Sequence, residues 1–227
     1  MMILSRCWLC KVFVLFVYFT AGGVVMADSN DHIKLQDPEL TGKQSVETLL
    51  QQRRSVRSYR KSSLILNEVG QLLWSAQGIT DSQGLRTAPS AGALYPLKLF
   101  VVVGDVNELS PGIYLYNPEE HSLMKTANGD FRKSMQKAAH GQSCIGDAAI
   151  VIVFTAIYQR TTRKYGKRGV RYVHMEVGYS GENLFLQAEA LDLGTVVVGA
   201  FDDDEVRDVL NLDSDIQPLS LMPVGRK

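Results

Sequence analysis

The apolar positions of the chain recur at two periods, and the longer of the two predicts helices. Residues 45–53 carry apolar side chains at helical intervals, so a helix is expected to end at the arginines that follow. A second stripe begins after Asn67, a good N-cap residue, and stops at Gly78. The longest stripe covers residues 172–191. Three amphipathic helices are therefore predicted, each with one face on a core.

Short apolar runs between turn signals predict the strands. These runs are "KLFVVVG", "AAIVIVFTA", "TVVVGAF" and "QPLSLMPVGRK", of which the second is hydrophobic enough for a central strand. We also expect a hairpin over "GIYLYNPEEHSLMK". Asp130 and Asp202 are predicted to cap two shorter helices, Asp202 with Glu205 in a capping box. Helices and strands alternate without a repeat, which predicts a single α+β domain.

The N-terminal segment, residues 1–27, is more apolar than the rest of the chain. Arg6 and Lys11 precede the run "VFVLFVYFTAGGVVMA", which ends on small residues at Ala27. This order is typical of a secretory signal, so we expect an exported protein, periplasmic or secreted. An uncleaved membrane anchor is the alternative, because the run approaches the roughly 18 residues that span a bilayer. The polar residues 28–44 are predicted to form a linker or arm.

Composition excludes several classes of function. The 227 residues include 24 basic and 24 acidic side chains, so no broad nucleic-acid-binding face is expected. Cys144 would be the only cysteine after cleavage, which excludes an intramolecular disulfide. The four histidines are scattered and form no zinc motif, so no metal site is predicted. The glycine motifs of dinucleotide-binding folds and P-loops are also absent from the sequence.

Three stretches remain as candidates for chemistry: "RRSVRSY" from Arg53, "PSAGALYP" from Pro89, and the terminal "PVGRK". Taken singly, they are interpreted as a solvated helix end, a turn and a soluble chain end. Taken together, two arginine sites and a glycine-bearing loop suit a phosphorylated ligand. Arginine forks match phosphate oxygens, and small loop residues let backbone N–H groups approach a flat ring.

With the long-helix region "RYVHMEVGYSGENLFLQAEALDLGTVVVGAFDDDEVRDVLNL", these stretches resemble the nitroreductase family of flavoproteins over residues 45–227. They are most similar to its dehydrogenase branch, which oxidises azolines to thiazoles and oxazoles. The resemblance implies a nitroreductase-like central mixed or antiparallel β-sheet flanked by helices. It also implies a homodimer with FMN at the subunit interface, and a helix containing Gly178 and Gly181 that forms either that interface or plain core.

The resemblance further implies which residues contact the flavin. The expected contacts with the FMN phosphate and ribityl chain are Arg53, Arg54, Ser55 and Arg57, with Arg226 as a second phosphate contact. The loop against the flavin, usually reached from the partner subunit, is Pro89, Ser90, Ala91 and Gly92. The strand end that faces the reactive part of the ring is Val198, Gly199 and Ala200.

Two departures favour the azoline-oxidising branch over a nitroaromatic reductase. Ala93 and Tyr95 stand where typical nitroreductases carry Asn and Gln. In the azoline-oxidising branch a Lys-Tyr pair is implicated in removing a substrate proton, and Lys164 and Tyr165 are the candidates here. An exposed basic loop is the alternative interpretation of that pair.

The expected function is therefore an FMN-dependent oxidoreductase of the dehydrogenase type, acting on a small-molecule or peptide-derived substrate. Reduced nicotinamides belong to the cytoplasm, so an exported enzyme is expected to pass electrons to oxygen or another acceptor. The alternatives are an NAD(P)H-dependent nitro or quinone reductase and a non-catalytic flavin-binding protein.

Overall fold

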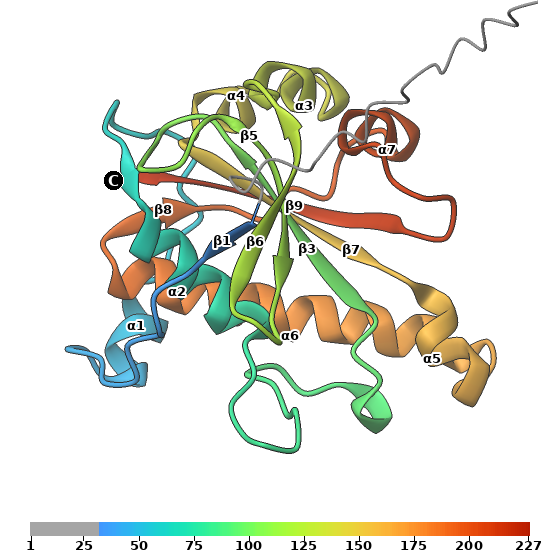
Figure 1. The fold of residues 1–227 in the computed structure, drawn as a ribbon. Helices are drawn as coiled ribbons and strands as arrows, with labels where there is room; N and C mark the ends of the chain where they lie inside the picture. The colour runs from blue at the N-terminus through green and yellow to red at the C-terminus, as the bar shows by residue number, and fades with distance from the viewer. Residues whose placement is uncertain (1–31) are drawn as a thin grey trace, which may run out of the picture.

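A central sheet lies between two layers of helices in the computed structural model, which describes residues 32–227 (Figure 1). Seven strands form the sheet in the order β1-β6-β5-β3-β7-β9-β8, and every neighbouring pair is antiparallel. They are β1 (His32–Lys34), β3 (Leu97–Val103), β5 (Gly112–Asn117), β6 (Ser122–Asn128), β7 (Ile150–Ala156), β8 (Leu193–Thr195) and β9 (Gln217–Arg226). A separate parallel pair joins β2 (Leu64–Ile65) to β4 (Val106–Asn107). The predicted α+β class and the predicted hairpin, β5–β6, are confirmed.

The central strands are mostly apolar on both faces because helices cover both faces of the sheet. On one face lie α2 (Leu66–Gln77) and α6 (Arg168–Ala190), and on the other lie α3 (Arg132–Ala138), α4 (Ser143–Asp147) and α7 (Asp203–Leu210). Strand β3 alternates between the two cores, with Leu97, Leu99, Val101 and Val103 in the first and Phe100 and Val102 in the second. The two-residue side-chain period of a strand produces this alternation.

Helices α1 (Val46–Gln52) and α5 (Tyr158–Tyr165) contact α6, and the short 3-10 helix η1 (Ala91–Ala93) lies in the loop before β3. None of the helices within residues 32–227 is long and apolar enough to cross a membrane. The signal or anchor predicted over residues 1–27 lies outside the described residues. Residues 32–34 of the predicted arm form β1, which pairs with the edge of β6.

Three predicted helix starts need correction. Helix α2 begins at Leu66, so Asn67 lies in its first turn and is not the N-cap. The carboxylate of Glu68 instead accepts the Ile65 N–H at 2.9 Å. Helix α6 begins at Arg168, earlier than predicted. The N-cap of α3 is Phe131 and not the predicted Asp130, whose carboxylate lies one residue earlier and accepts the Arg132 N–H at 3.0 Å. The end of α2 is as predicted, because the helix stops before Gly78.

The predicted capping box of α7 forms only in half. The Asp202 carboxylate accepts the Glu205 N–H at 2.9 Å, as an N-cap should. The Asp202 N–H does not donate to the Glu205 carboxylate, because it donates to the Ala138 carbonyl at 2.9 Å. Tertiary contact with α3 therefore replaces the second bond of the box.

The predicted strand "TVVVGAF" is wrong beyond its first residue. Strand β8 ends at Thr195, and Val198 makes only an isolated pair of backbone hydrogen bonds with Leu221, at 2.8 and 2.9 Å. The chain then leaves the sheet, because Gln142 Nε2 donates to the Ala200 carbonyl at 2.9 Å. This departure exposes Gly199 and Ala200.

Candidate functional site

The arginine stretch from Arg53 to Arg60 runs along the end of strands β8 and β9. The Val56 N–H donates to the Thr195 carbonyl at 2.9 Å, and the Arg60 N–H donates to the Arg226 carbonyl at 3.0 Å. The structure thus brings the first and last of the three candidate stretches together. It also places them beside the residues that lead from Thr195 to Val198.

Two glycines allow this close approach. A Cβ atom on Gly225 would lie 2.7 Å from Cγ of Tyr59, and one on Gly194 would lie 2.6 Å from Cγ1 of Val56. Both distances are too short for real side chains, so any larger residue would push the stretch away from the sheet. The glycine of the terminal "PVGRK" therefore serves packing against Tyr59.

The arginines of this stretch point to different surroundings. The guanidinium carbon of Arg53 lies 4.9 Å from the centre of the Phe185 ring on α6, while Arg54 Nη1 donates to two backbone carbonyls at the end of α1, each at 2.8 Å. Arg57 lines a cavity of about 540 Å³ beside α4. Within residues 32–227, neither Arg54 nor Arg57 has a carboxylate within 4.0 Å. Two cations are therefore available for an anion, on separate parts of the surface.

Arg226 differs from these arginines because its guanidinium has an internal partner. Its Nη1 and Nη2 atoms contact the Glu68 carboxylate at 2.7 and 2.9 Å, in the two-pronged geometry that arginine prefers. Nη2 also donates to the Ser63 carbonyl at 3.3 Å. A phosphate contact by Arg226 stays a prediction, and such a contact would compete with Glu68.

The Pro-Ser-Ala-Gly loop meets the predicted Lys-Tyr pair. Gly92 has a φ of +66°, and a Cβ atom on it would lie 2.7 Å from Tyr165 Oη and 2.9 Å from Lys164 Nζ. Ser90 fixes the shape of the loop by accepting the Tyr95 N–H at 2.9 Å. Two stretches that are distant in sequence thus form one surface, with a phenol and an ammonium group on it.

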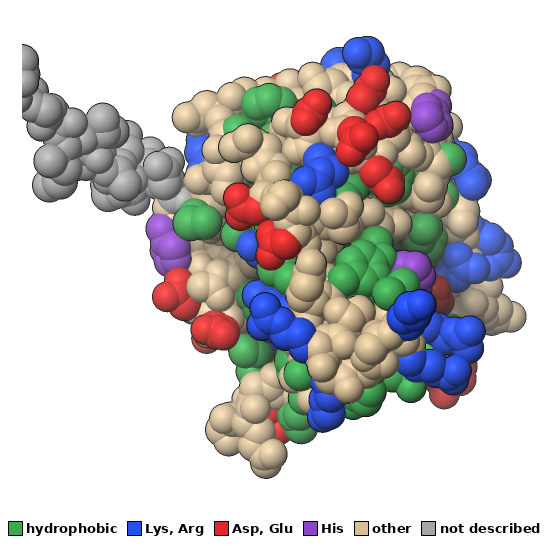
Figure 2. Space-filling model, turned by 90° about the vertical axis from the view of Figure 1, so that its right-hand side faces the viewer, with side chains coloured by type: hydrophobic (Ala, Val, Ile, Leu, Met, Phe, Trp, Pro, Cys, Tyr) green, Lys and Arg blue, Asp and Glu red, His purple; other side chains and the backbone are tan. Residues whose placement is uncertain are grey.

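Lys164 also belongs to a basic patch. Figure 2 shows lysine and arginine side chains gathered on the side of the molecule that carries α5. The exposed members on α5 and the start of α6 are Arg163, Lys164, Lys167, Arg168 and Arg171. Lys164 therefore both lies beside Gly92 and belongs to the exposed basic patch. The geometry is compatible with both interpretations of the Lys-Tyr pair, a proton-transfer pair and an exposed basic loop.

Sequence reasoning missed Glu176, which lies in the middle of α6. Its side chain is 2% exposed, and its Oε1 atom has no hydrogen-bond partner within residues 32–227. Burial raises the pKa of Glu176 to about 7, while a hydrogen bond with Ser90 and the charge of Arg86 oppose the shift. The spacing Val173, Glu176, Ser180, Leu184 could have revealed it, because those residues share one buried helix face.

The two glycines of the predicted interface helix α6 differ in burial. Gly181 is buried, and a Cβ atom on it would meet the sulfur of Met222 at 3.7 Å. A Cβ atom on Gly178 would meet nothing within 4 Å. Its neighbours Met175 and Tyr179 are 46% and 44% exposed. Only the face with Gly178 is open to a partner, and Gly181 belongs to the core.

Comparison with known proteins identifies the family. Residues 50–226 match the Nitroreductase family. The chain is 46% identical over 197 residues to the protein MJ1384 of Methanocaldococcus jannaschii, which bears a nitroreductase name; the match covers 87% of this chain and 98% of that protein. It is 28% identical over 159 residues to the microcin B17-processing protein McbC of Escherichia coli, with 67% of this chain and 58% of McbC covered.

Solved structures agree with the sequence match. A crystal structure from Ralstonia eutropha JMP134 that bears a nitroreductase name superposes with a TM-score of 0.76 at 28% identity, covering 88% of this chain and 91% of the other. The E. coli microcin synthetase McbBCD complex with truncated pro-MccB17 bound gives a TM-score of 0.67 at 26% identity, with 78% and 72% covered. Sequence and fold lead to the same assignment: this chain belongs to the nitroreductase family of oxidoreductases.

Proposed function

We propose that this protein is an FMN-dependent dehydrogenase that acts as a homodimer. The observation that carries the proposal is the contact of the Gly92 loop with Lys164 and Tyr165. This contact places the Lys164 ammonium and the Tyr165 phenol, which can both exchange protons, beside the loop that the family resemblance assigns to the flavin. Similarity to McbC, which processes microcin B17, supports the dehydrogenase branch. The substrate class proposed is a small molecule or a modified peptide.

The residues present fit FMN. Arg53 and Arg54 would hold the phosphate, since the guanidinium of Arg54 contacts only backbone carbonyls of its own chain. The backbone at Gly199 would face the ring, because this residue is exposed and no atom lies within 4 Å of a Cβ placed there. FMN, when bound, supplies the acceptor for a hydride equivalent. The protein supplies the phosphate contacts and the surface on which the substrate is oriented.

Lys164 and Tyr165 would manage the proton that leaves the substrate. Lys164 Nζ lies 5.4 Å from the centre of the Tyr165 ring, and Nζ and the Tyr165 Oη atom lie 2.9 and 2.7 Å from the position that a Cβ atom on Gly92 would take. A substrate bound on this surface would have both the Lys164 nitrogen and the Tyr165 phenol oxygen within reach of the proton that it loses.

A second copy of the chain would complete the site. In Figure 1 the arginine stretch and the Gly92 loop lie toward different ends of α6. Arg53 contacts Phe185 in the second half of this helix, whereas Ser90 contacts Glu176 in the first half. In the proposed dimer, the loop of one subunit meets the arginines of the other, and the open face at Gly178 contributes to the interface.

We also propose that the enzyme works outside the cytoplasm and passes electrons to oxygen or another acceptor. This part of the proposal rests on the signal-like residues 1–27. An NAD(P)H-dependent nitro or quinone reductase is the second candidate, favoured by the 46% identity to a protein with a nitroreductase name. Steady-state assays separate the two: efficient NADH or NADPH oxidation coupled to nitro or quinone reduction would select the second candidate.

The first experiment is a visible spectrum of the purified protein, followed by titration with FMN. We expect a flavin spectrum, and we expect Arg54→Ala to weaken FMN binding about tenfold or more, because charge-assisted hydrogen bonds contribute about 1.5–3 kcal/mol. Arg163→Ala, an equal charge change on exposed α5, is the control and should leave FMN binding unchanged. A colourless protein that takes up no FMN would refute both flavin-dependent candidates.

A further inference from the structure

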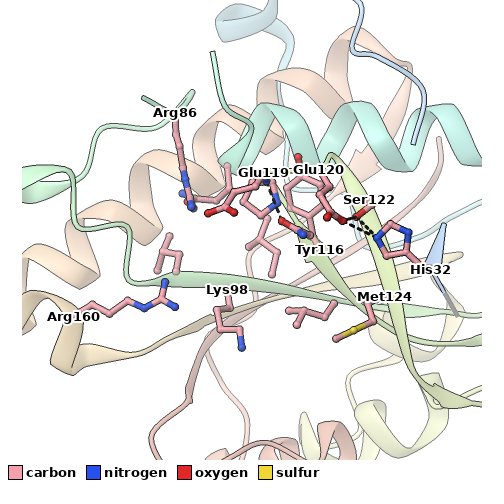
Figure 3. A pocket seen from close by; sticks show the side chains of 15 residues that line it. His32, Arg86, Lys98, Tyr116, Glu119, Glu120, Ser122, Met124 and Arg160 are labelled. Carbon is pink, nitrogen blue, oxygen red and sulfur yellow. Dashed lines mark hydrogen bonds and ion pairs between the residues drawn. The ribbon is translucent and has the colours of Figure 1, made fainter. Parts of the chain in front are cut away.

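A cavity of about 410 Å³ opens where strands β3 and β5 separate (Figure 3). The two strands pair from Phe100 to Val103, but the first residues of β3 pair only with β7. The divergence leaves a gap in the sheet lined by Leu97, Leu99 and Leu115. The arginine stretch contributes no residue to this cavity, so the cavity is separate from the phosphate contacts proposed above.

Three cations line the cavity: Arg86, Lys98 and Arg160. None of them has a carboxylate within 4.0 Å among residues 32–227. Their charges are therefore not paired at contact distance, although Glu119 and Glu120 line the same cavity and the charge of Glu176 acts on Arg86. Arg86 and Lys98 are half-buried, whereas Arg160 is exposed. A half-buried charge without a close counter-ion is costly, so an anion that paired with these groups would be bound favourably.

The two arginines are held in place by Tyr95. The guanidinium carbon of Arg86 lies 4.5 Å from the centre of the Tyr95 ring, and Arg160 Nη1 donates to the Tyr95 carbonyl at 3.0 Å. Arg86 Nη1 donates to Gln77 Oε1 at 2.8 Å. Within the described part of the chain, Nη2 of each arginine makes no hydrogen bond. Each guanidinium is therefore fixed at one nitrogen and has another free to donate.

The opposite side of the cavity is acidic. In Figure 3 the side chains of Arg86 and Arg160 lie on one side, and those of His32, Glu120 and Ser122 lie on the other. The Glu120 carboxylate is already paired with His32 Nε2 at 2.8 Å, and Glu119 also lines the cavity. Ligands with negative charge along their whole length, such as nucleotides, would be repelled at this side.

We propose that this cavity binds a small organic carboxylate with an apolar body. The carboxylate would accept hydrogen bonds from Arg86 and Arg160, whose forks match its two oxygens. The apolar body would lie on Leu97, Leu99 and Leu115. The volume falls in the range of small-molecule pockets, about 300–1,000 Å³. Because none of the residues proposed to hold FMN lines this cavity, the proposal stands whether or not the protein is a flavoprotein.

The test is calorimetric titration of the purified protein with hexanoate, with and without added FMN. Hexanoate should bind, while hexanamide, which has the same chain length and no charge, should bind at least about tenfold more weakly, the effect of losing one charge-assisted contact. Equal binding of the two compounds, or no binding of hexanoate, would overturn the proposal.

Variants locate the binding site. Arg160→Gln should weaken hexanoate binding about tenfold, and Arg163→Gln, the same change three positions along α5 and outside the cavity, should not. Arg86→Gln should have the larger effect, but it also disturbs the contact with Gln77. Lys98→Met, at a side chain with no recorded hydrogen bond within residues 32–227, therefore gives an independent check and should also weaken binding. Equal losses in Arg160→Gln and Arg163→Gln would place hexanoate elsewhere and refute the site.

Discussion

The two ends of α6 are built in different ways. At one end, the arginine stretch lies against β8 and β9 through backbone hydrogen bonds and two glycine contacts. At the other end, the Gly92 loop is surrounded by side chains from distant parts of the chain, including the buried Glu176. The first end is a backbone-defined anchor, whereas the second contains the groups that can exchange protons. In the proposed function, binding and proton transfer are thus assigned to separate parts of one subunit.

The largest expected effect is on turnover, and it concerns the end of α6 that carries the Gly92 loop. Lys164→Met should lower turnover about a hundredfold or more, the usual contribution of a positioned acid or base, while FMN affinity stays unchanged. Lys167→Met, in the same basic patch, is the matched control and should keep normal turnover. Equal losses in both variants would mean that the patch as a whole acts on the substrate, and would remove Lys164 from its proposed role.

A second prediction concerns the buried carboxyl at the same end. Burial raises the pKa of Glu176 to about 7, above its usual value of 4.5, so the native state binds the proton more tightly than the unfolded state does. The wild-type free energy of unfolding should therefore fall as the pH rises from about 5 to about 8. Glu176→Gln should lack this fall and be the more stable protein at pH 8, by up to about 3 kcal/mol.

Urea denaturation at several pH values measures this difference between the two proteins. Glu182→Gln, at a carboxylate on the same helix whose side chain is 45% exposed, is the control and should keep the wild-type pH dependence. If the fall persisted in Glu176→Gln, the buried carboxyl would not be its source.

At the other end of α6, where the arginine stretch lies against β8 and β9, stability should depend on packing and not on pH. Gly225→Ala should lower the free energy of unfolding by about 2 kcal/mol, because the added Cβ atom would meet the Tyr59 ring at 2.7 Å. Thermal unfolding measures the loss. Combining the change with Tyr59→Ala should cost less than the sum of the two single changes, since the clash with the ring is then gone and only the Cβ atom of residue 59, at 2.8 Å, is left. Strict additivity would contradict the proposed contact.

The smallest effect is expected between the two ends, on the open face of α6. Gly178→Ala should raise the free energy of unfolding of the subunit by about 0.5–1 kcal/mol, because alanine favours the helix and meets no atom within 4 Å. Sedimentation at several concentrations then tests the proposed dimer: an alanine on a closely packed interface should weaken association. Association that is unchanged would exclude Gly178 from the interface.

Many elements were predictable because their signals are local. Gly78 ends α2 and Asp202 caps α7, since both act on neighbouring backbone groups. Asn67 failed as a cap because Glu68 supplies the acceptor for the start of α2. The run after Thr195 failed as a strand because Gln142, which precedes α4 and is distant in sequence, holds the Ala200 carbonyl outside the sheet. Intrinsic propensity limits the secondary structures that a segment can form, and its tertiary contacts determine which of them it forms.

The same distinction applies to the candidate site. The sequence alone indicated the arginine stretch, the loop and the Lys-Tyr pair, because each is a contiguous motif. It could not show that Gly92 meets Lys164 and Tyr165, that Arg226 is paired with Glu68, or that a glutamate is buried beneath the loop. Those facts depend on which segments meet in space. The residue types are written in the chain, but their partners, burial and pKa values arise only when the sheet and α6 bring distant segments together.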